Sequence, residues 1–280
     1  MERVTIAVII SVYNRLELTK KCIGDLLTQN GAEEEFILSI YIVDDDSTDG
    51  TREFLEGLGA EVNVIQGDGS WFWAKSMAIA ESRAIESFPD YILWLNDDVQ
   101  LAPNAIETLL RTERTRNECN VVVGALLDPR TQLTSYGGRM KSGRHPLAFV
   151  TAGVSSETTY VDAFHGNVVL VSRCVSERVG TIDGSYAHAF ADDDYSLRCG
   201  YASIPIVQAP GYIGICEGRD PIRPDSLRSR IMFLRDPKGL PIGSLRRFLV
   251  KHRPSTWPLY LCKTVFRILF VPKKYWSKSI

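Results

Sequence analysis

Two adjacent carboxylates, Asp97 and Asp98, follow the apolar run Tyr91–Leu95, which is typical of a short strand buried on both faces. In an open α/β sheet, ligands bind where the strands end. Neighbouring carboxylates repel each other unless a cation lies between them, and a divalent metal that carries a diphosphate meets this need. The alternative is a solvated turn or a helix N-cap before Pro103, because Asp is common in both.

Acidic or glycine-containing turns recur where other strands are expected to end. The cluster Asp44-Asp45-Asp46 closes the apolar stretch Phe36–Val43. The turn Gly67-Asp68-Gly69-Ser70 follows the short run Val62–Gln66. A third acidic cluster, Asp192-Asp193-Asp194, begins a helical pattern. This recurrence favours the metal interpretation over an isolated solvated turn.

Strand-like and helix-like patterns alternate over the first 127 residues. The expected strands are 4–12, 36–43, 62–66, 91–95 and 121–127, and the expected helices are about 16–29, 47–57, 71–87 and 104–116. This alternation predicts an α/β fold with a doubly wound, mostly parallel sheet. Neither a GxGxxG motif after the first strand nor a GxxxxGK[ST] motif occurs, which argues against a dinucleotide-dependent dehydrogenase and a P-loop protein.

The pattern changes after residue 127. Residues 128–156 are rich in Gly, Pro, Arg and Ser and predict a long excursion or an irregular hairpin. Two further strands are expected at Val168–Val171 and Ile204–Gln208. At the helix start between them, the pattern predicts that Asp192 and Asp194 face a cleft.

The composition is that of an ordinary globular protein, with 45% apolar and 24% charged residues in 280. The N-terminal run Val4–Val12 is too short to span a bilayer and predicts a core strand, not a signal sequence. The six cysteines are scattered without CxxC spacing. This argues against a zinc site and a disulfide framework and favours a reducing cytoplasm.

The charge is divided unevenly along the chain. Residues 226–280 contain 13 Lys and Arg and one acid, a net charge of +12, whereas residues 1–225 contain 19 basic and 33 acidic residues, a net charge of −14. Within the basic end, Trp257–Val271 is apolar and aromatic and carries Lys263 and Arg267. It is expected either to lie in the interface of an anionic membrane or to pack on the main domain with a solvated basic face.

Taken together and in this order, five motifs resemble the family 2 glycosyltransferases, including rhamnosyltransferase-like members. The motifs are Ile10–Arg15, Val43–Thr51, Gly67–Ser70, Leu95–Asp98, and Asp192 with Arg198 six residues later. The resemblance covers about residues 4–220 and implies the GT-A fold, a nucleotide-sugar donor and transfer with inversion. It also implies a glycosyltransferase domain, 1–225, with a nucleotide-sugar half, 1–127, and an acceptor half, 128–225, followed by a basic helical tail, 226–280.

By position in these motifs, the resemblance assigns a set of residues to the nucleotide sugar: Ser11, Tyr13, Asn14, Arg15, Asp45, Lys75, Asn96 and Asp97. Asp45 would accept a hydrogen bond from the N3–H of uracil or thymine, because a carboxylate only accepts. Lys75 would reach a phosphate, or be a solvated helix residue. Asp98 would bind Mn²⁺ or Mg²⁺, and Asp97 would lie near the ribose or a metal-bound water.

On the acceptor side, Asp192 would be the catalytic base, its pKa raised by the neighbouring carboxylates, and Arg198 would stabilise its helix. Trp73 and His165 are candidate acceptor contacts, although core packing is the alternative for the tryptophan and a structural role for the histidine. Many relatives place a histidine of the metal site after the last core strand. Here Cys216 or Glu217 occupies that place, so a third ligand is not assured.

The sequence therefore predicts a hexosyl- or deoxyhexosyltransferase that uses a UDP- or dTDP-sugar and acts on a saccharide or lipid-linked saccharide in cell-surface polysaccharide synthesis. The expected location is cytoplasmic, peripheral at the inner face of the membrane, with no nucleic-acid partner. A sugar-nucleotide nucleotidyltransferase and a non-catalytic carbohydrate-binding protein are the alternatives. The first normally needs a basic, glycine-rich loop after the first strand, and Tyr13-Asn14-Arg15-Leu16 does not supply one.

Overall fold

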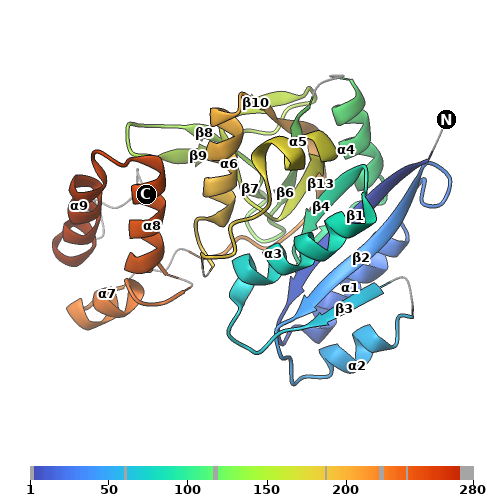
Figure 1. The fold of residues 1–280 in the computed structure, drawn as a ribbon, viewed down its shortest axis with the longest axis horizontal. Coiled ribbons are helices and arrows are strands. Elements are labelled where there is room, and N and C mark those ends of the chain that lie inside the picture. The colour runs from blue at the N-terminus through green and yellow to red at the C-terminus, as the bar shows by residue number, and fades with distance from the viewer. Residues whose placement is uncertain are drawn as a thin grey trace.

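The computed structural model describes residues 3–59, 62–115, 119–186, 188–220, 224–237 and 239–271. Helices cover both faces of a central mixed sheet, as Figure 1 shows. The strand order of this sheet is β10-β13-β6-β12-β4-β1-β2-β3. The predicted α/β fold with a mostly parallel central sheet is confirmed, because the first four strands run parallel to one another.

The N-terminal half consists of strands and helices that alternate along the chain. Its strands are β1 (Val4–Val12), β2 (Phe36–Asp44), β3 (Val62–Gln66), β4 (Tyr91–Leu95), β5 (Gln100–Leu101) and β6 (Val121–Leu127). Its helices are α1 (Leu16–Leu27), α2 (Thr51–Glu56), α3 (Phe72–Ala84), the short 3₁₀ helix η1 (Ile85–Ser87) and α4 (Ala105–Arg114). Because β1 to β4 are parallel, their carboxyl ends share one edge of the sheet.

The central strand β1 explains why helices are needed on both sides. Its residues alternate in direction, so that Ile6, Val8 and Ile10 pack with α1, α2 and α4 while Ala7 and Ile9 pack with α3 and α6. All five side chains are essentially inaccessible to solvent. A strand buried on both faces must be apolar throughout, which is the pattern that the sequence has there.

The second half extends the sheet and adds a small one. Its strands are β7 (Thr134–Tyr136), β8 (Gly138–Lys141), β9 (Phe149–Thr151), β10 (Thr159–Val161), β11 (Ala163–Phe164), β12 (Val168–Ser172) and β13 (Ile206–Ile215). β12 lies antiparallel between β4 and β6, and β11-β8-β9 form a separate three-stranded sheet. The last strand is longer than the predicted 204–208, because after register shifts it continues alongside β6 as far as Ile215.

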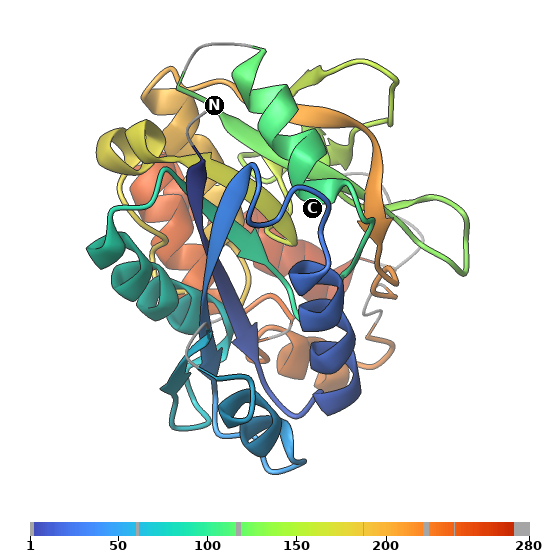
Figure 2. The same ribbon diagram turned by 90° about the vertical axis from the view of Figure 1, so that its right-hand side faces the viewer.

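Five helices complete this half: α5 (Arg173–Val179), α6 (Ala191–Tyr201), α7 (Leu227–Phe233), α8 (Ile242–His252) and α9 (Trp257–Phe270). Leu245, Phe248 and Leu249 of α8 and Ile268 of α9 join the core beneath α3 and α6. The three C-terminal helices lie together at one end of the molecule (Figure 1), and Figure 2 shows the sheet turned by 90°. Among the described residues, no helix combines the length and apolar character that crossing a membrane requires.

The expectation that the cysteines form no disulfide is wrong for one pair. Cys119, which precedes β6, is bonded to Cys174 in α5, and their Cα atoms are 5.8 Å apart. The two residues are 55 positions apart in the chain, so no short spacing motif marks them. The remaining four cysteines are free thiols.

Candidate active site

The acidic pair at the end of β4 shares one cation. Nη1 of Arg15, from the loop after β1, lies 3.0 Å from Oδ1 of Asp97 and 2.9 Å from Oδ2 of Asp98. Asp97 is only 5% exposed. Burial raises the pKa of Asp97 to about 7 despite the opposing charge of Arg15, and the charge of Asp98 adds to the rise. The predicted repulsion is therefore real, and the protein relieves it with a guanidinium.

The geometry of this pair fits a divalent cation. One cationic atom already lies within hydrogen-bond distance of both carboxylates. Mg²⁺ is commonly held by one or two carboxylates, with substrate phosphates and water as the other ligands. Within the described ranges, no three His, Cys, Asp or Glu side chains cluster closely enough to hold a metal alone. Asp98 and Asp97 would therefore hold Mn²⁺ or Mg²⁺ together with a diphosphate.

Of the two residues considered for a third ligand, Cys216 lies at the pair. Its Sγ is 3.6 Å from Oδ1 of Asp98. Burial first, and then the charge of Asp98, raises the pKa of the Cys216 thiol, so it is protonated at neutral pH. Glu217 is exposed, and its carboxylate is 3.8 Å from Arg130.

The side chains of Asn96 and Trp73 are hydrogen-bonded to each other. Nε1 of Trp73 donates a 2.8 Å hydrogen bond to Oδ1 of Asn96. Trp73 also packs edge-on against Trp94, with ring centroids 6.3 Å apart. A Cβ on Gly166 would lie only 2.7 Å from the Trp73 ring, so glycine is required for this close approach. The indole therefore has a packing role, and its predicted acceptor contact stays a prediction.

Asp45 builds the loop between β3 and α3. Its carboxylate accepts hydrogen bonds from the backbone N–H groups of Gly69 at 3.0 Å, Trp71 at 3.1 Å and Phe72 at 3.0 Å. A Cβ on Gly67 would lie 2.5 Å from Oδ1 of Asp45, which explains the glycine there. The predicted contact of Asp45 with a nucleotide base is untested, and most of its accepting capacity is used within the protein.

Asn14 joins two of the loops at this edge. Its backbone N–H donates to Oγ of Ser47 at 2.9 Å, and its Oδ1 accepts from the N–H of Thr48 at 2.7 Å. Ser11 is half-buried at the end of β1, and the side chain of Tyr13 is 52% exposed. The residues predicted to line the nucleotide pocket therefore meet at one edge, although Asn14 is engaged in tying the loops.

Four of the eight residues other than glycine that have a positive φ in the described ranges lie at this edge. Asn14, Asp46, Phe72 and Phe190 have φ angles of 50°, 66°, 54° and 81°. These left-handed conformations are costly for residues other than glycine and are often found at functional sites. Each of the four lies in, or next to, a motif that the sequence singles out.

Asp192 lies in the first turn of α6, half-exposed, and approaches the loop before β12. Its Oδ2 is 3.4 Å from the backbone nitrogen of Gly166, the glycine on which Trp73 packs. Its neighbour Asp193 forms a short ion pair with Arg139. Burial raises the pKa of Asp193 to about 6, with the charge of Arg139 opposing the rise. Of the three acids Asp192, Asp193 and Asp194, Asp192 is thus the one to which no cationic side chain is bonded among the described residues.

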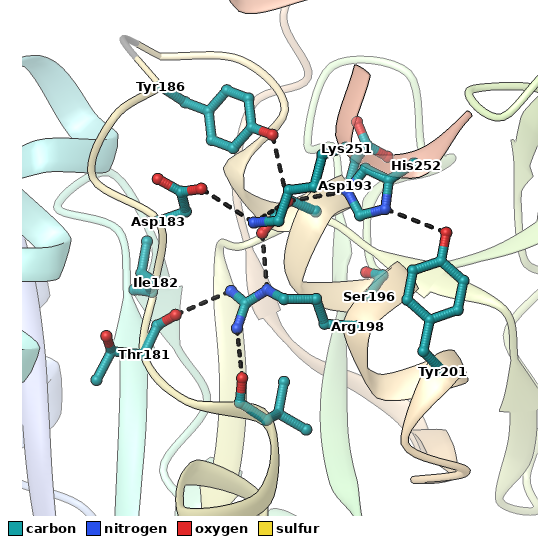
Figure 3. Close-up of polar contacts among 12 residues, drawn as sticks. Thr181, Ile182, Asp183, Tyr186, Asp193, Ser196, Arg198, Tyr201, Lys251 and His252 are labelled. Carbon is teal, nitrogen blue, oxygen red and sulfur yellow. Dashed lines mark hydrogen bonds and ion pairs between the residues drawn. The ribbon is translucent and has the colours of Figure 1, made fainter. Parts of the chain in front are cut away.

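Asp194 does not face a cleft as predicted but is completely buried. Its oxygens lie 2.8 Å from Nε of Arg198, 2.7 Å from Nζ of Lys251 and 2.9 Å from Nε2 of His252. Figure 3 shows the side chains of Arg198, from α6, and of Lys251 and His252, from α8, converging on this point. Burial opposes ionisation of Asp194, but the contacts with His252, Lys251 and Arg198 outweigh it and hold the pKa of Asp194 well below its ordinary value.

Arg198 also anchors α6 to the preceding segment, as the sequence suggested. It donates to the carbonyl oxygens of Val179 at 2.7 Å and Thr181 at 2.8 Å. Because Asp193 and Asp194 each have cationic partners, they do not supply the uncompensated repulsion expected around Asp192. The sequence missed Lys251 and His252, which come from the tail.

His165 and Lys75 lie outside this ionic network. Burial, aided by the nearby charge of Arg139, lowers the pKa of His165 to about 3, and its Nδ1 contacts the backbone of Gly137. A neutral, backbone-bonded imidazole fits the structural alternative, and the acceptor role stays a prediction. Lys75 is exposed, and its Nζ lies 4.7 Å from the centroid of the Trp71 ring.

The family model for glycosyl transferase family 2 matches residues 7–167, more than half of the chain. The chain belongs to this family. The match includes the acidic pair and every predicted donor residue but ends before Asp192. No curated protein matches the sequence closely enough to count as a relative.

Solved structures share the fold of this glycosyltransferase at low identity. The mannosyltransferase PcManGT from Pyrobaculum calidifontis, in complex with GDP-Man and Mn²⁺, is 16% identical with a TM-score of 0.54, and the alignment covers 95% of this chain and 70% of that one. S. aureus TarS 1–349 in complex with UDP-GlcNAc is 13% identical with a TM-score of 0.55, over 95% of this chain and 81% of that one. At such identities the likeness establishes the fold alone.

We expect Asp98→Asn to abolish the Mn²⁺ binding that UDP or dTDP supports, because one carboxylate cannot replace the pair. Electron paramagnetic resonance of free Mn²⁺ in the presence of the nucleoside diphosphate measures this without any turnover. Glu53→Gln, which removes one charge from exposed α2, is the matched control and should bind as the wild type does. Equal Mn²⁺ affinity in Asp98→Asn and the control would exclude this pair as the metal site.

Asp194→Asn should lower the free energy of unfolding by about 3 kcal/mol at neutral pH, because it removes the buried carboxylate charge that Arg198, Lys251 and His252 contact together. The folded-state pKa of Asp194 is depressed, so its contribution is present above the ordinary value of 3.8 and is lost as the pH falls below it. Urea unfolding at pH 7 and near about pH 3 should therefore show the gap between variant and wild type closing. Asp183→Asn, which also removes a partner of Lys251 but nearer the surface, should cost about 1 kcal/mol or less.

Proposed function

We propose that this family 2 glycosyltransferase moves a hexosyl or deoxyhexosyl group from a UDP- or dTDP-sugar to a hydroxyl of a saccharide or lipid-linked saccharide, with inversion. The observation that carries the proposal is the pairing of two sites at one edge of the sheet. Asp97 and Asp98 share a cation at the end of β4, and Asp192 stands at the start of α6. A cation site and a carboxylate base are what this transfer requires.

In the proposed reaction, Asp192 accepts the proton of the acceptor hydroxyl as that oxygen bonds to the anomeric carbon of the donor sugar. The bond from this carbon to the diphosphate oxygen breaks, and the nucleoside diphosphate leaves with the electron pair. Attack from the face opposite the leaving group inverts the anomeric centre. When bound by Asp98 and Asp97, Mn²⁺ or Mg²⁺ would neutralise charge on the leaving diphosphate.

Arg15 gives the donor site a second source of positive charge. In this structure its guanidinium bridges Asp97 and Asp98. Once a metal takes that place, the side chain is free to turn toward phosphate oxygens, for which a guanidinium is well suited. The nucleotide sugars in complex with the two solved relatives, GDP-Man and UDP-GlcNAc, support a donor of this class.

The experiment that tests the base is Asp192→Asn. Transfer should fall by roughly 10²–10⁴-fold, the usual scale for loss of a general base. Donor affinity should change little, because Asp192 is not one of the residues proposed to bind the nucleotide or the metal. Single-turnover transfer and calorimetric donor binding on the same preparation measure both. A parallel loss of binding and transfer would make Asp192 a structural residue.

We also infer that the C-terminal helices hold the enzyme at an anionic membrane surface, which would suit a lipid-linked acceptor and polysaccharide synthesis at the inner face. On α9, Leu259, Phe266 and Phe270 are 72%, 61% and 64% exposed. They recur at helical spacing with the exposed Lys263 between them. The sequence continues with the basic stretch Lys273–Lys278, which lies outside the described residues. An exposed apolar stripe flanked by lysine is typical of helices that lie in a membrane interface.

Replacing both Phe266 and Phe270 by Ser should weaken binding to vesicles that contain phosphatidylserine, because the stripe loses most of its apolar area. Co-sedimentation with vesicles measures the bound fraction. Leu133→Ser, at a residue that is 68% exposed on a distant loop, is the control. This assignment would be contradicted if the wild-type protein did not bind these vesicles, or if the variant bound them as well as the wild type does.

A further inference from the structure

A cleft of about 820 Å³ lies between the start of α3, the turn at residues 184–186 and one side of α8 from its first turn to its last. Four basic side chains line it, namely Lys75, Arg246, Arg247 and Lys251. Among the described residues of its wall, none is acidic. The cleft is thus a concave surface with a positive field, which attracts anions.

Two of these cations have no ion-pair partner within the described parts of the chain. Nζ of Lys75 lies 4.7 Å from the centroid of the Trp71 ring, and the guanidinium of Arg246 lies 5.4 Å from that of Trp257. Aromatic faces orient these groups without neutralising them. Lys251 is compensated by Asp194, so the uncompensated charge of the cleft belongs mainly to the other basic residues.

The N-terminus of α8 opens into the same cleft. This 11-residue helix has no capping side chain, and its dipole adds positive potential. The N–H of Ile242 donates to the carbonyl oxygen of Leu234, but those of Gly243 and Ser244 have no backbone acceptor among the described residues and are available. Ser244, in its first turn, lines the cleft and is only 8% exposed, yet its hydroxyl has no hydrogen-bond partner among the described residues. A Cβ on Gly243 would meet nothing within 4 Å, which shows the space beside these groups.

The cleft also adjoins both halves of the active site. Trp71 and Phe72 on its α3 wall donate their backbone N–H groups to Asp45. On the opposite wall, Lys251 contacts Asp194, two residues from the proposed base Asp192. A ligand anchored here would therefore lie against the elements that position both the donor loop and α6.

We propose that this cleft binds a phosphate or diphosphate group carried by the acceptor, an assignment that rests on the transferase function proposed above. Arginine forks, a serine hydroxyl and an uncapped helix N-terminus are all donors, and together they suit phosphate oxygens. The aromatic side chains of Trp71 and Phe72 provide apolar walls on which a sugar ring can pack. The acceptor is thus a phosphorylated saccharide, either free or linked to a lipid through its phosphate.

The test uses calorimetry of the full-length protein in EDTA, so that the metal-dependent donor site does not bind the probes. The probes are glucose 1-phosphate and farnesyl diphosphate. Wild type should bind at least one of them without metal. The double variant Arg246→Gln, Arg247→Gln should bind that probe at least about tenfold more weakly, because two charged donors are lost. Preference for farnesyl diphosphate would indicate a lipid-linked acceptor, and preference for glucose 1-phosphate a free one.

Two further variants control for effects of the substitutions on folding. Ser244→Asp places a carboxylate in the first turn of α8, where it favours the helix but repels phosphate, so binding should be lost while the melting temperature holds or rises. Arg228→Gln with Arg235→Gln removes two exposed charges from α7 and just beyond it, outside the cleft, and should leave binding unchanged. Phosphate binding that is absent in wild type, or equal in Ser244→Asp, would overturn the proposal.

Nucleotide binding with Mn²⁺ is measured on the same samples to separate this result from the transferase function. Both cleft variants should keep metal-dependent nucleotide binding within about twofold of wild type, because their substitutions lie outside the acidic pair. Intact nucleotide binding without phosphate binding would reject the cleft alone. Phosphate binding without any nucleotide binding would keep the anion site but reject its role in glycosyl transfer.

Discussion

The mutual repulsion of Asp97 and Asp98 is the constraint on which this site depends. The parallel strands deliver both carboxylates to the end of β4, where burial raises the pKa of Asp97 to about 7. Only a cation between them makes the arrangement stable, and here Arg15 supplies it. For the same reason we propose that the pair binds a metal and its diphosphate, because a divalent ion satisfies both carboxylates with more charge than one guanidinium.

In the other two acidic clusters, a carboxylate already has its hydrogen-bond and ion-pair partners within the protein. Asp194 is buried and bonded to Arg198, Lys251 and His252, and it locks α6 against α8. The carboxylate oxygens of Asp45 accept hydrogen bonds from backbone N–H groups and fix the loop before α3. These residues fix the loops and helices around the site, whereas Asp98 and Asp192 are partly exposed to solvent, where ligands can reach them. Through Lys251 and His252, the basic tail contacts the helix that carries Asp192.

Much of this could be predicted from the sequence because strands buried on both faces have an unmistakable pattern. Val4–Val12 and Tyr91–Leu95 have the bounds predicted for them. The pattern could not show pairings between distant residues. His252 and Asp194 are 58 positions apart, and neither periodicity nor a motif connects them. The Cys119–Cys174 bond was missed for the same reason. Local sequence predicts which elements end in carboxylates, but only the packing decides which of those carboxylates are already neutralised.

The central claim is that the cation shared at the end of β4 is replaced by a metal that carries a nucleoside diphosphate. Calorimetric titration of UDP, dTDP, GDP and ADP, each with and without Mn²⁺, tests this most directly. The account predicts that UDP or dTDP binds only when Mn²⁺ is present and that ADP does not bind under either condition. If no nucleotide bound with any metal, the donor site would be refuted and the acidic pair would be no more than a structural ion pair with Arg15.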